Sequence, residues 1–401
     1  MTTEPAASRV ARPPADFLSE KVRSLQPSGI RRFFDMLAEM TDVISLTIGE
    51  PDFNTPEPIT RAAIESLEAG ETHYTANGGM LELRELIAAN LQARYGVEYD
   101  PRTETIITVG ASEAVDASLR AVLNAGDEVI YHEPCFVSYA PCITLAGGIP
   151  VPLSTTDATD FRVTADQIAA AITPRTKVLF LGYPNNPTGA VLTHEDLVAI
   201  AEVVEAHDLV VVTDEIYDRL VYGGHQHTAF SSLPRMRDRT VLIGGFSKSY
   251  AMTGWRIGYV AAPEALMTGI AKVHQYGIMC APTPAQYAAI AALRIGEPFV
   301  LDMLAEYDRR RALMTRRLNE IGLLCFEPHG AFYCFPNITS TGLDDESFAR
   351  ELLLEEHVAV VPGSAFGPSG AGHVRACYAT AYEQIVEAMD GIERFVRRHG
   401  G

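Results

Sequence analysis

The chain has 401 residues, of which 47% are apolar and 21% are charged, and its formal net charge at pH 7 is −19. Because no stretch of about 18 consecutive apolar residues occurs, we expect a soluble globular protein with room for two hydrophobic cores, and no contact with a membrane. The acidic charge also disfavours nucleic acid as a partner, since phosphates are bound mainly through Lys and Arg.

Residues 1–16 are rich in Ala and Pro and lack the apolar core of a signal peptide. This composition predicts a loosely ordered arm and a cytoplasmic protein. Six cysteines are scattered along the chain, without a C-x-x-C pair or a histidine at ligand spacing. We therefore expect neither a disulfide framework nor a bound metal.

Short β-branched runs alternate with helix-length segments between about residues 104 and 262. The predicted strands are 105–109, 128–131, 177–181, 209–213 and 240–243. This alternation predicts an α/β fold with a doubly wound, mainly parallel sheet and helices on both of its faces. In such sheets, ligands bind beyond the carboxyl ends of the strands.

Four glycine-rich or polar segments follow directly on predicted strands: 110–112, 183–189, 214–217 and 244–248. We expect them to meet at one edge of the sheet. The first begins a helix that runs to about residue 124, whose N-terminus could hold an anion.

The C-terminal part begins with one long charged helix, predicted over 298–321, with residues 308–311 on its solvated face. Smaller strands and helices follow it.

The order of the motifs along the chain is more informative than any one of them. The segments are Ile-Gly-Glu-Pro-Asp-Phe at 48–53, Tyr-Pro-Asn-Asn-Pro-Thr-Gly at 183–189, Asp-Glu-Ile-Tyr at 214–217, the run 244–256, Gly-Ala-Phe-Tyr at 330–333 and Val-Pro-Gly-Ser-Ala-Phe-Gly at 361–367. Over nearly the whole chain they resemble the pyridoxal phosphate (PLP) enzymes of fold type I. The similarity is greatest to the class I/II aminotransferases, in the aromatic-type subgroup of the aspartate/aromatic family.

The resemblance implies a division of the chain that no linker marks in the sequence. Residues 45–295 would form a large PLP-binding domain and residues 296–401 a small α+β domain. Residues 1–44 would supply an N-terminal arm and part of the small domain.

The resemblance also implies the catalytic residues. Lys248 would be the Schiff-base lysine and proton shuttle, although a lone lysine would be read as a surface residue. Asp214 would face the pyridine nitrogen of PLP, with the cap of a helix as its alternative role. Tyr217 and Asn186 would hold the phenolic oxygen of the cofactor.

The implied phosphate ligands are the helix start Gly110, Ala111 and Ser112, together with Arg256. Many relatives carry a serine three residues before the lysine, where this chain has Gly245. Ser247 is the candidate to replace it.

The remaining implied residues concern stacking, the partner subunit and the substrate. Phe136 would stack on the cofactor ring, and Tyr74 would cross a homodimer interface to the phosphate of the neighbouring site. Arg375 would bind the substrate α-carboxylate, assisted by Asn186 and the backbone of Gly49. Ile30 would close over the substrate.

We expect a ping-pong aminotransferase that moves an amino group from an L-amino acid to a 2-oxo acid such as 2-oxoglutarate. Aromatic or other large apolar donors are expected to be favoured over aspartate, because residues 275–284 lack the basic side chain that dicarboxylate-specific relatives place there. A PLP-dependent lyase of the carbon–sulfur β-lyase type would share every residue named above. A non-catalytic regulatory module is the third interpretation, which the intact Lys248 disfavours.

Overall fold

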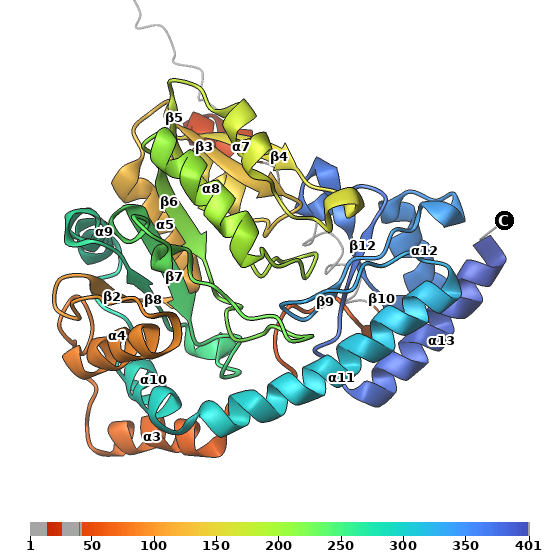
Figure 1. Cartoon of the computed structure of the whole chain (residues 1–401). Coiled ribbons are helices and arrows are strands. Elements are labelled where there is room, and N and C mark those ends of the chain that lie inside the picture. Colours follow the sequence, from red (N-terminus) through yellow and green to blue (C-terminus); the bar gives the residue numbers. More distant parts are fainter. Residues whose placement is uncertain (1–13, 26–39, 41, 400–401) are drawn as a thin grey trace, which may run out of the picture.

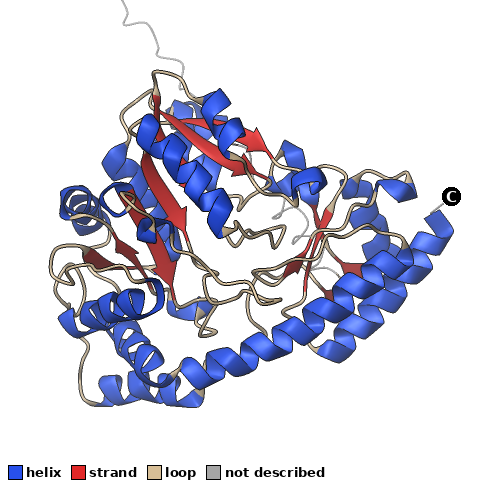
Figure 2. Cartoon of the chain, viewed as in Figure 1, coloured by secondary structure: helices blue, strands red, loops and turns tan. Residues whose placement is uncertain are grey.

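The computed structural model describes residues 14–25, 40 and 42–399, so the predicted substrate contact Ile30 lies outside the described part of the chain. A large sheet with helices on both sides occupies one part of the molecule, and two small sheets with long helices occupy the other (Figures 1 and 2). The short helix α1 (Glu20–Ser24) precedes both.

The large sheet has seven strands in the order β2-β8-β7-β6-β5-β3-β4. All run parallel except β8, which is antiparallel to both of its neighbours. The strands are β2 (Thr105–Thr108), β3 (Glu128–Glu133), β4 (Ile149–Ser154), β5 (Thr176–Leu181), β6 (Val210–Asp214), β7 (Thr240–Gly245) and β8 (Gly258–Ala261). The predicted α/β class with a mainly parallel sheet is confirmed.

The five predicted strands are present, but sequence patterns missed β4 and β8. The first of these, with sequence Ile-Pro-Val-Pro-Leu-Ser, carries two prolines and lies at the sheet edge, where a missing N–H group does not break a ladder. The second is only four residues long and begins with glycine. Neither has the long β-branched run that marks the central strands.

Helices cover both faces of the large sheet because successive residues of a strand point to opposite sides. On β6, Val211 packs with α7 and α8, whereas Val212 packs with α5, α6 and α9. The helices around this sheet are α3 (Glu57–Glu68), α4 (Leu81–Tyr95), α5 (Gly110–Val122), α6 (Tyr139–Ala146), α7 (Ala165–Ala171), α8 (His194–Ala206), α9 (Glu264–Gly277) and α10 (Thr283–Ile295).

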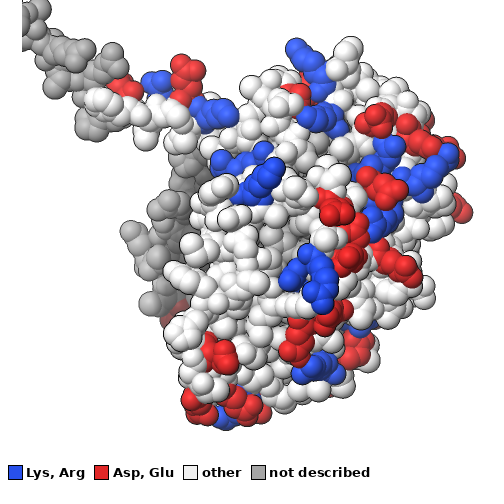
Figure 3. Space-filling model, turned by 90° about the vertical axis from the view of Figure 1, so that its left-hand side faces the viewer, with Lys and Arg blue, Asp and Glu red and all other residues white. Residues whose placement is uncertain are grey.

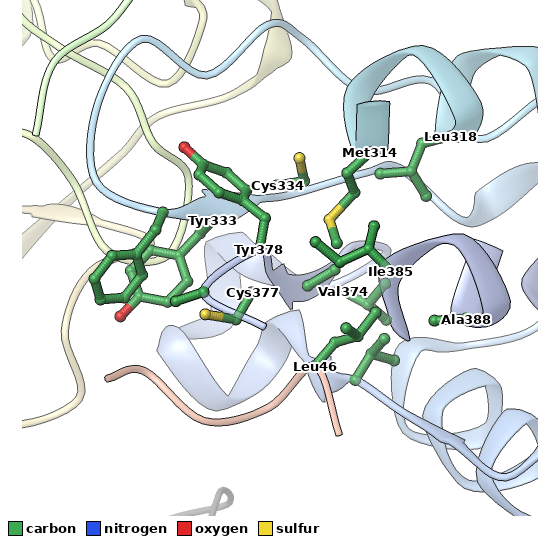
Figure 4. Packing of buried hydrophobic residues seen from close by; sticks show 14 of the residues in the cluster. Leu46, Met314, Leu318, Tyr333, Cys334, Val374, Cys377, Tyr378, Ile385 and Ala388 are labelled. Carbon is green, nitrogen blue, oxygen red and sulfur yellow. The ribbon is translucent and has the colours of Figure 1, made fainter. Parts of the chain in front are cut away.

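The C-terminal part contains a second core, and Figure 4 shows its packing around Val374, Ile385 and Leu46. Leu46 follows strand β1, which pairs with β10, so segments from the two ends of the chain lie side by side. The elements here are β1 (Ile44–Ser45), β9 (Tyr333–Cys334), β10 (Val358–Ala359), β11 (Val361–Pro362), β12 (Val374–Cys377), α11 (Glu297–Ile321), α12 (Asp345–Glu356) and α13 (Tyr382–His399). The domain limits at 44/45 and 295/296 stay predictions.

The long helix α11 differs from its prediction in one respect. Residues 308–311 were expected on a solvated face, but Arg310 and Arg311 are only 6% and 5% exposed. Arg310 contacts both oxygens of Asp52 at 2.8 and 2.9 Å, and Arg311 reaches Glu327 at 2.6 Å. An arginine can be buried when its guanidinium is paired, and these partners lie too far away in sequence to be predicted.

Along the face drawn in Figure 3, basic and acidic side chains are interspersed and do not gather into one basic field. In the described part of the chain, none of the helices combines the length and the apolar character needed to cross a membrane.

Candidate active site

A cavity of about 550 Å³ lies where the large sheet meets the small sheets. Residues that follow β2, β5, β6 and β7 line one side, as predicted for the carboxyl edge of a parallel sheet. Tyr333 and Arg375, on β9 and β12, line the other side. The volume is in the range typical of sites for small molecules.

Lys248 follows the end of β7 and projects into this cavity. Its Nζ donates a hydrogen bond to the carbonyl oxygen of Gly49 at 2.5 Å, and lies 5.9 and 5.7 Å from the ring centres of Tyr217 and Phe332. Burial lowers the pKa of Lys248 to about 8, and the positive charge of Arg375 acts in the same direction. The amine is therefore more readily neutral than an exposed lysine.

Asp214 is the last residue of β6 and is buried. Its Oδ2 accepts a hydrogen bond from the Tyr139 hydroxyl at 2.9 Å, and its Oδ1 accepts one from the Ile216 amide at 3.2 Å. Burial raises the pKa of Asp214 to about 6. A turn and not a helix follows the strand, so the alternative role of helix cap is wrong.

Arg375 is 4% exposed and donates hydrogen bonds to two groups, the Asn186 side chain and the Thr47 carbonyl. Its Nη1 donates to Oδ1 of Asn186 at 2.9 Å, and its Nη2 donates to the carbonyl of Thr47 at 2.6 Å. Its Nε is buried and has no hydrogen-bond partner among the described residues. The Tyr217 hydroxyl lies 2.8 Å from the hydroxyl of Tyr333.

Helix α5 presents its N-terminus to the cavity, which Ala111 and Ser112 line. Gly110 adopts a φ of 72°, and a Cβ there would lie 2.7 Å from Nη2 of Arg256. Glycine at this position thus lets the guanidinium approach the helix start. The same Nη2 lies 3.5 Å from the Ser112 hydroxyl. A helix N-terminus beside an arginine is a favourable site for an anion.

Gly245, which stands where many relatives have serine, is closely surrounded. A Cβ at this position would lie 2.8 Å from Cδ1 of Ile216 and 3.4 Å from Cα of Gly258. A serine here would require Ile216 to move, and Ile216 itself lines the cavity. Ser247 is part of the described lining, so a hydroxyl is still supplied two residues further along.

The structure brings most of the predicted site residues to this one cavity. Those that line it are Gly49, Ala111, Ser112, Phe136, Asn186, Asp214, Tyr217, Ser247, Lys248, Arg256 and Arg375. Tyr74 does not: it is 81% exposed and lines a separate hollow.

Two tyrosines of the site were not assigned from the sequence. Tyr139 pairs with Asp214, and Tyr333 pairs with Tyr217. Tyr139 stands three residues after Phe136, which the family resemblance had assigned, and Tyr333 ends the segment Gly-Ala-Phe-Tyr. Their partners are 75 and 116 residues away in the sequence, so no local pattern could reveal the pairs.

The donor set fits PLP. The start of α5 and Arg256 suit its phosphate, the Asp214 carboxylate suits its ring nitrogen, and the Lys248 amine suits its aldehyde. A mainly parallel α/β sheet with this arrangement at its carboxyl edge defines the class of PLP-dependent enzymes of fold type I.

Comparisons with known proteins identify the family. The family model described as aminotransferase class I and II matches residues 41–392. The chain therefore belongs to this family, and it is a PLP-dependent aminotransferase.

Individual relatives are similar over nearly their whole length. A putative aminotransferase, YugH, of Bacillus subtilis is 50% identical, over 95% of this chain and 99% of the relative. Aromatic-amino-acid aminotransferase 2 of Thermococcus litoralis is 45% identical, over 95% and 98%. The solved structure of an aromatic aminotransferase from Pyrococcus horikoshii is 48% identical, with a TM-score of 0.88 over 91% of this chain and 99% of that one.

Proposed function

We propose that this aminotransferase moves the amino group of an aromatic or other large apolar L-amino acid to a 2-oxo acid such as 2-oxoglutarate, in two half-reactions. The carrying observation is that the Lys248 amine lines the same cavity as the Asp214 carboxylate and the Arg375 guanidinium. When bound, PLP supplies an aldehyde that takes up the amino group and a ring that delocalises the electron pair left on the substrate Cα.

Lys248 would hold the cofactor until the substrate amine replaces it, and would then take the proton from the substrate Cα. A pKa of about 8 suits this task, because near neutral pH the amine both accepts and returns a proton readily. The Gly49 carbonyl, which accepts a hydrogen bond from the amine, would hold it beside the substrate.

Asp214 would pair with the ring nitrogen, and the cationic partner would keep its carboxylate ionised in spite of its burial. The Tyr139 hydroxyl and the Ile216 amide fix the two carboxylate oxygens. Tyr217 and Asn186 would donate to the phenolic oxygen, and Asn186 has its amide Nδ2 for this because its Oδ1 accepts from Arg375.

Arg375 would bind the substrate α-carboxylate. Its Nη1 and Nη2 each make one hydrogen bond, to Asn186 and to the Thr47 carbonyl, and each has a second N–H group with which to donate to a carboxylate. Ser112, Ser247 and Arg256 would hold the phosphate at the opposite end of the cavity, and Phe136 would stack on the ring.

The proposed preference for apolar donors rests on the lining of the cavity. The relatives include both aspartate and aromatic aminotransferases, so their names do not decide the substrate. An aspartate aminotransferase of Pyrococcus abyssi, 47% identical, stands beside the aromatic enzymes. Among the described lining residues the basic side chains are Lys248, Arg256 and Arg375, and each is already assigned. A second substrate carboxylate would have no ionic partner among these described residues, and burying it unpaired costs at least a few kcal/mol. Use of 2-oxoglutarate, itself a dicarboxylate, as acceptor requires that a basic side chain outside these lining residues reaches its distal carboxylate.

A homodimer with shared sites, and a cytoplasmic location, complete the proposal. Two further hollows lie next to the cavity and to Tyr74. The first shares Glu50, Thr253 and Arg256 with the cavity, and the second, which Tyr74 lines, shares Val109, Pro282 and Pro284 with the first. Tyr276, near the second hollow in sequence, is 87% exposed. Large exposed apolar side chains around such a groove favour an interface between subunits.

The test is a panel of amino donors with 2-oxoglutarate as acceptor. We expect kcat/KM for phenylalanine, tyrosine and leucine to exceed that for aspartate by about a hundredfold. A transaminase forms glutamate in step with the new 2-oxo acid. A carbon–sulfur β-lyase, given a cysteine S-conjugate, would instead release a thiol, pyruvate and ammonia without forming glutamate. An aspartate value well above all others would contradict the proposed specificity.

A further inference from the structure

Tyr333 contacts both Tyr217, which is proposed to bind the cofactor, and Arg375, which is proposed to bind the substrate carboxylate. It lies on β9, opposite Cys377 of β12, so its side chain shares a sheet face with Arg375 two residues away. Figure 4 shows its ring at one end of the C-terminal core, apart from the aliphatic side chains of Val374 and Ile385. The side chain is fully buried, yet it lines the cavity.

Three contacts fix its hydroxyl and ring. The hydroxyl oxygen lies 2.8 Å from that of Tyr217, and the central carbon of the Arg375 guanidinium lies 4.6 Å from the centre of the Tyr333 ring. A Cβ at Gly49 would lie 2.6 Å from the Tyr333 hydroxyl, so glycine there makes room for it. The phenol therefore contacts Tyr217, proposed to bind the cofactor, and Arg375, proposed to bind the carboxylate. It also lies close to Gly49, whose carbonyl accepts a hydrogen bond from Lys248.

The order of donation follows from the number of protons. A phenol has one proton and two lone pairs. If Tyr217 donates its proton to the cofactor oxygen, its own oxygen can only accept, and the Tyr333 hydroxyl is the neighbour in reach. Hydrogen bonds in such a chain strengthen one another.

Arg375 controls how strongly Tyr333 donates. Burial raises the pKa of Tyr333, and the positive charge of Arg375 counteracts this rise. A substrate carboxylate bound to Arg375 would neutralise that charge and make the phenol a weaker donor. Binding of a carboxylate to Arg375 would then weaken the hydrogen bond that Tyr333 donates to the Tyr217 oxygen.

We propose that Tyr333 is a positioning residue that donates to Tyr217 and couples the occupancy of Arg375 to the hydrogen bond between Tyr217 and the cofactor. This inference rests on the roles proposed above for Tyr217 and Arg375.

The test uses the PLP-loaded enzyme and its pH-dependent absorbance, which requires no turnover. In Tyr333→Phe, the apparent pKa of the bound cofactor should rise by about one pH unit, the effect of one lost hydrogen bond. Adding 3-phenylpropanoate, a carboxylate without an amino group, should raise that pKa in the wild type and by clearly less in the variant.

A double-mutant cycle shows whether Tyr333 acts through Tyr217. In the Tyr217→Phe background, Tyr333→Phe should cause no further change in the apparent pKa. Tyr307→Phe is the matched control, because it removes another buried hydroxyl, which has no hydrogen-bond partner among the described residues. It should leave the titration as in the wild type.

Equal titrations of Tyr333→Phe and wild type, or an undiminished effect in the Tyr217→Phe background, would overturn the proposal. Failure of the proposed transamination would be seen separately, as absence of amino-group exchange in the wild-type enzyme.

Discussion

In its proposed role, Lys248 must be neutral to react, whereas the amine of an exposed lysine is protonated near neutral pH. Burial in the cavity lowers the pKa of Lys248 from 10.5 to about 8. The folded protein thus binds fewer protons than the unfolded chain between these two pH values. The contribution of this residue to stability therefore rises as the pH increases through that window.

This pKa can be measured directly on the cofactor-free protein. Competitive acetylation over a series of pH values, followed by peptide mapping, should give Lys248 a midpoint near 8. The same peptide from protein unfolded in denaturant is the control and should titrate like an ordinary lysine, at about 10.4. Equal midpoints in the folded and unfolded protein would show that the amine is not desolvated in the cavity.

Helix α11 runs from the part with the large sheet to the C-terminal part (Figure 1). Its Arg310 connects it to the segment that carries Gly49 and Asp52. The guanidinium contacts both oxygens of Asp52 and one oxygen of Glu306. The rings of Phe53 and Tyr307 lie 5.3 and 5.8 Å from it. The helix thereby holds the segment in which the Gly49 carbonyl accepts the hydrogen bond from Lys248.

We predict that Arg310→Met lowers the free energy of unfolding by roughly 2–3 kcal/mol, because the partly buried Asp52 loses its arginine and Glu306 keeps only the exposed Arg309. Chemical denaturation gives this value. The neighbouring Arg309→Met is the matched control: its guanidinium also contacts Glu306, but its side chain is 55% exposed, so the loss should be below about 0.5 kcal/mol. Similar losses in the two variants would refute the structural role of Arg310.

Elements with a strong local pattern could be predicted from the sequence, and elements held by distant partners could not. The β-branched run of β6 identifies a central strand by itself. Burial of Arg310 depends on Asp52, 258 residues away, and the sequence at 308–311 is that of an exposed helix face. The same reason limits the site: its motifs could be located, but the pairing of Tyr333 with Tyr217 depends on how the two sheets meet.

At the scale of the whole molecule, the position of Tyr74 decides whether one chain contains a complete site. Tyr74 does not line the cavity, and 81% of the residue is exposed, beside a hollow that shares lining residues with the hollow next to Arg256. Tyrosine is enriched at interfaces between proteins, so its exposure suits the proposed contact. In a symmetric dimer, each chain would present its Tyr74 to the cavity of the other.

Complementation between two inactive variants tests this arrangement. Lys248→Ala should lose activity by several orders of magnitude, and Tyr74→Ala should lose it by weakened cofactor binding. Each cavity would combine Lys248 of one chain with Tyr74 of the other. In a mixed dimer, one cavity would therefore contain both substitutions, and the other would contain the native Lys248 and the native Tyr74. Mixing with subunit exchange should therefore restore up to a quarter of the wild-type activity, since half of the dimers are mixed and half of their sites are intact. If exchange is demonstrated by mass spectrometry and no activity returns, Tyr74 does not act across the interface.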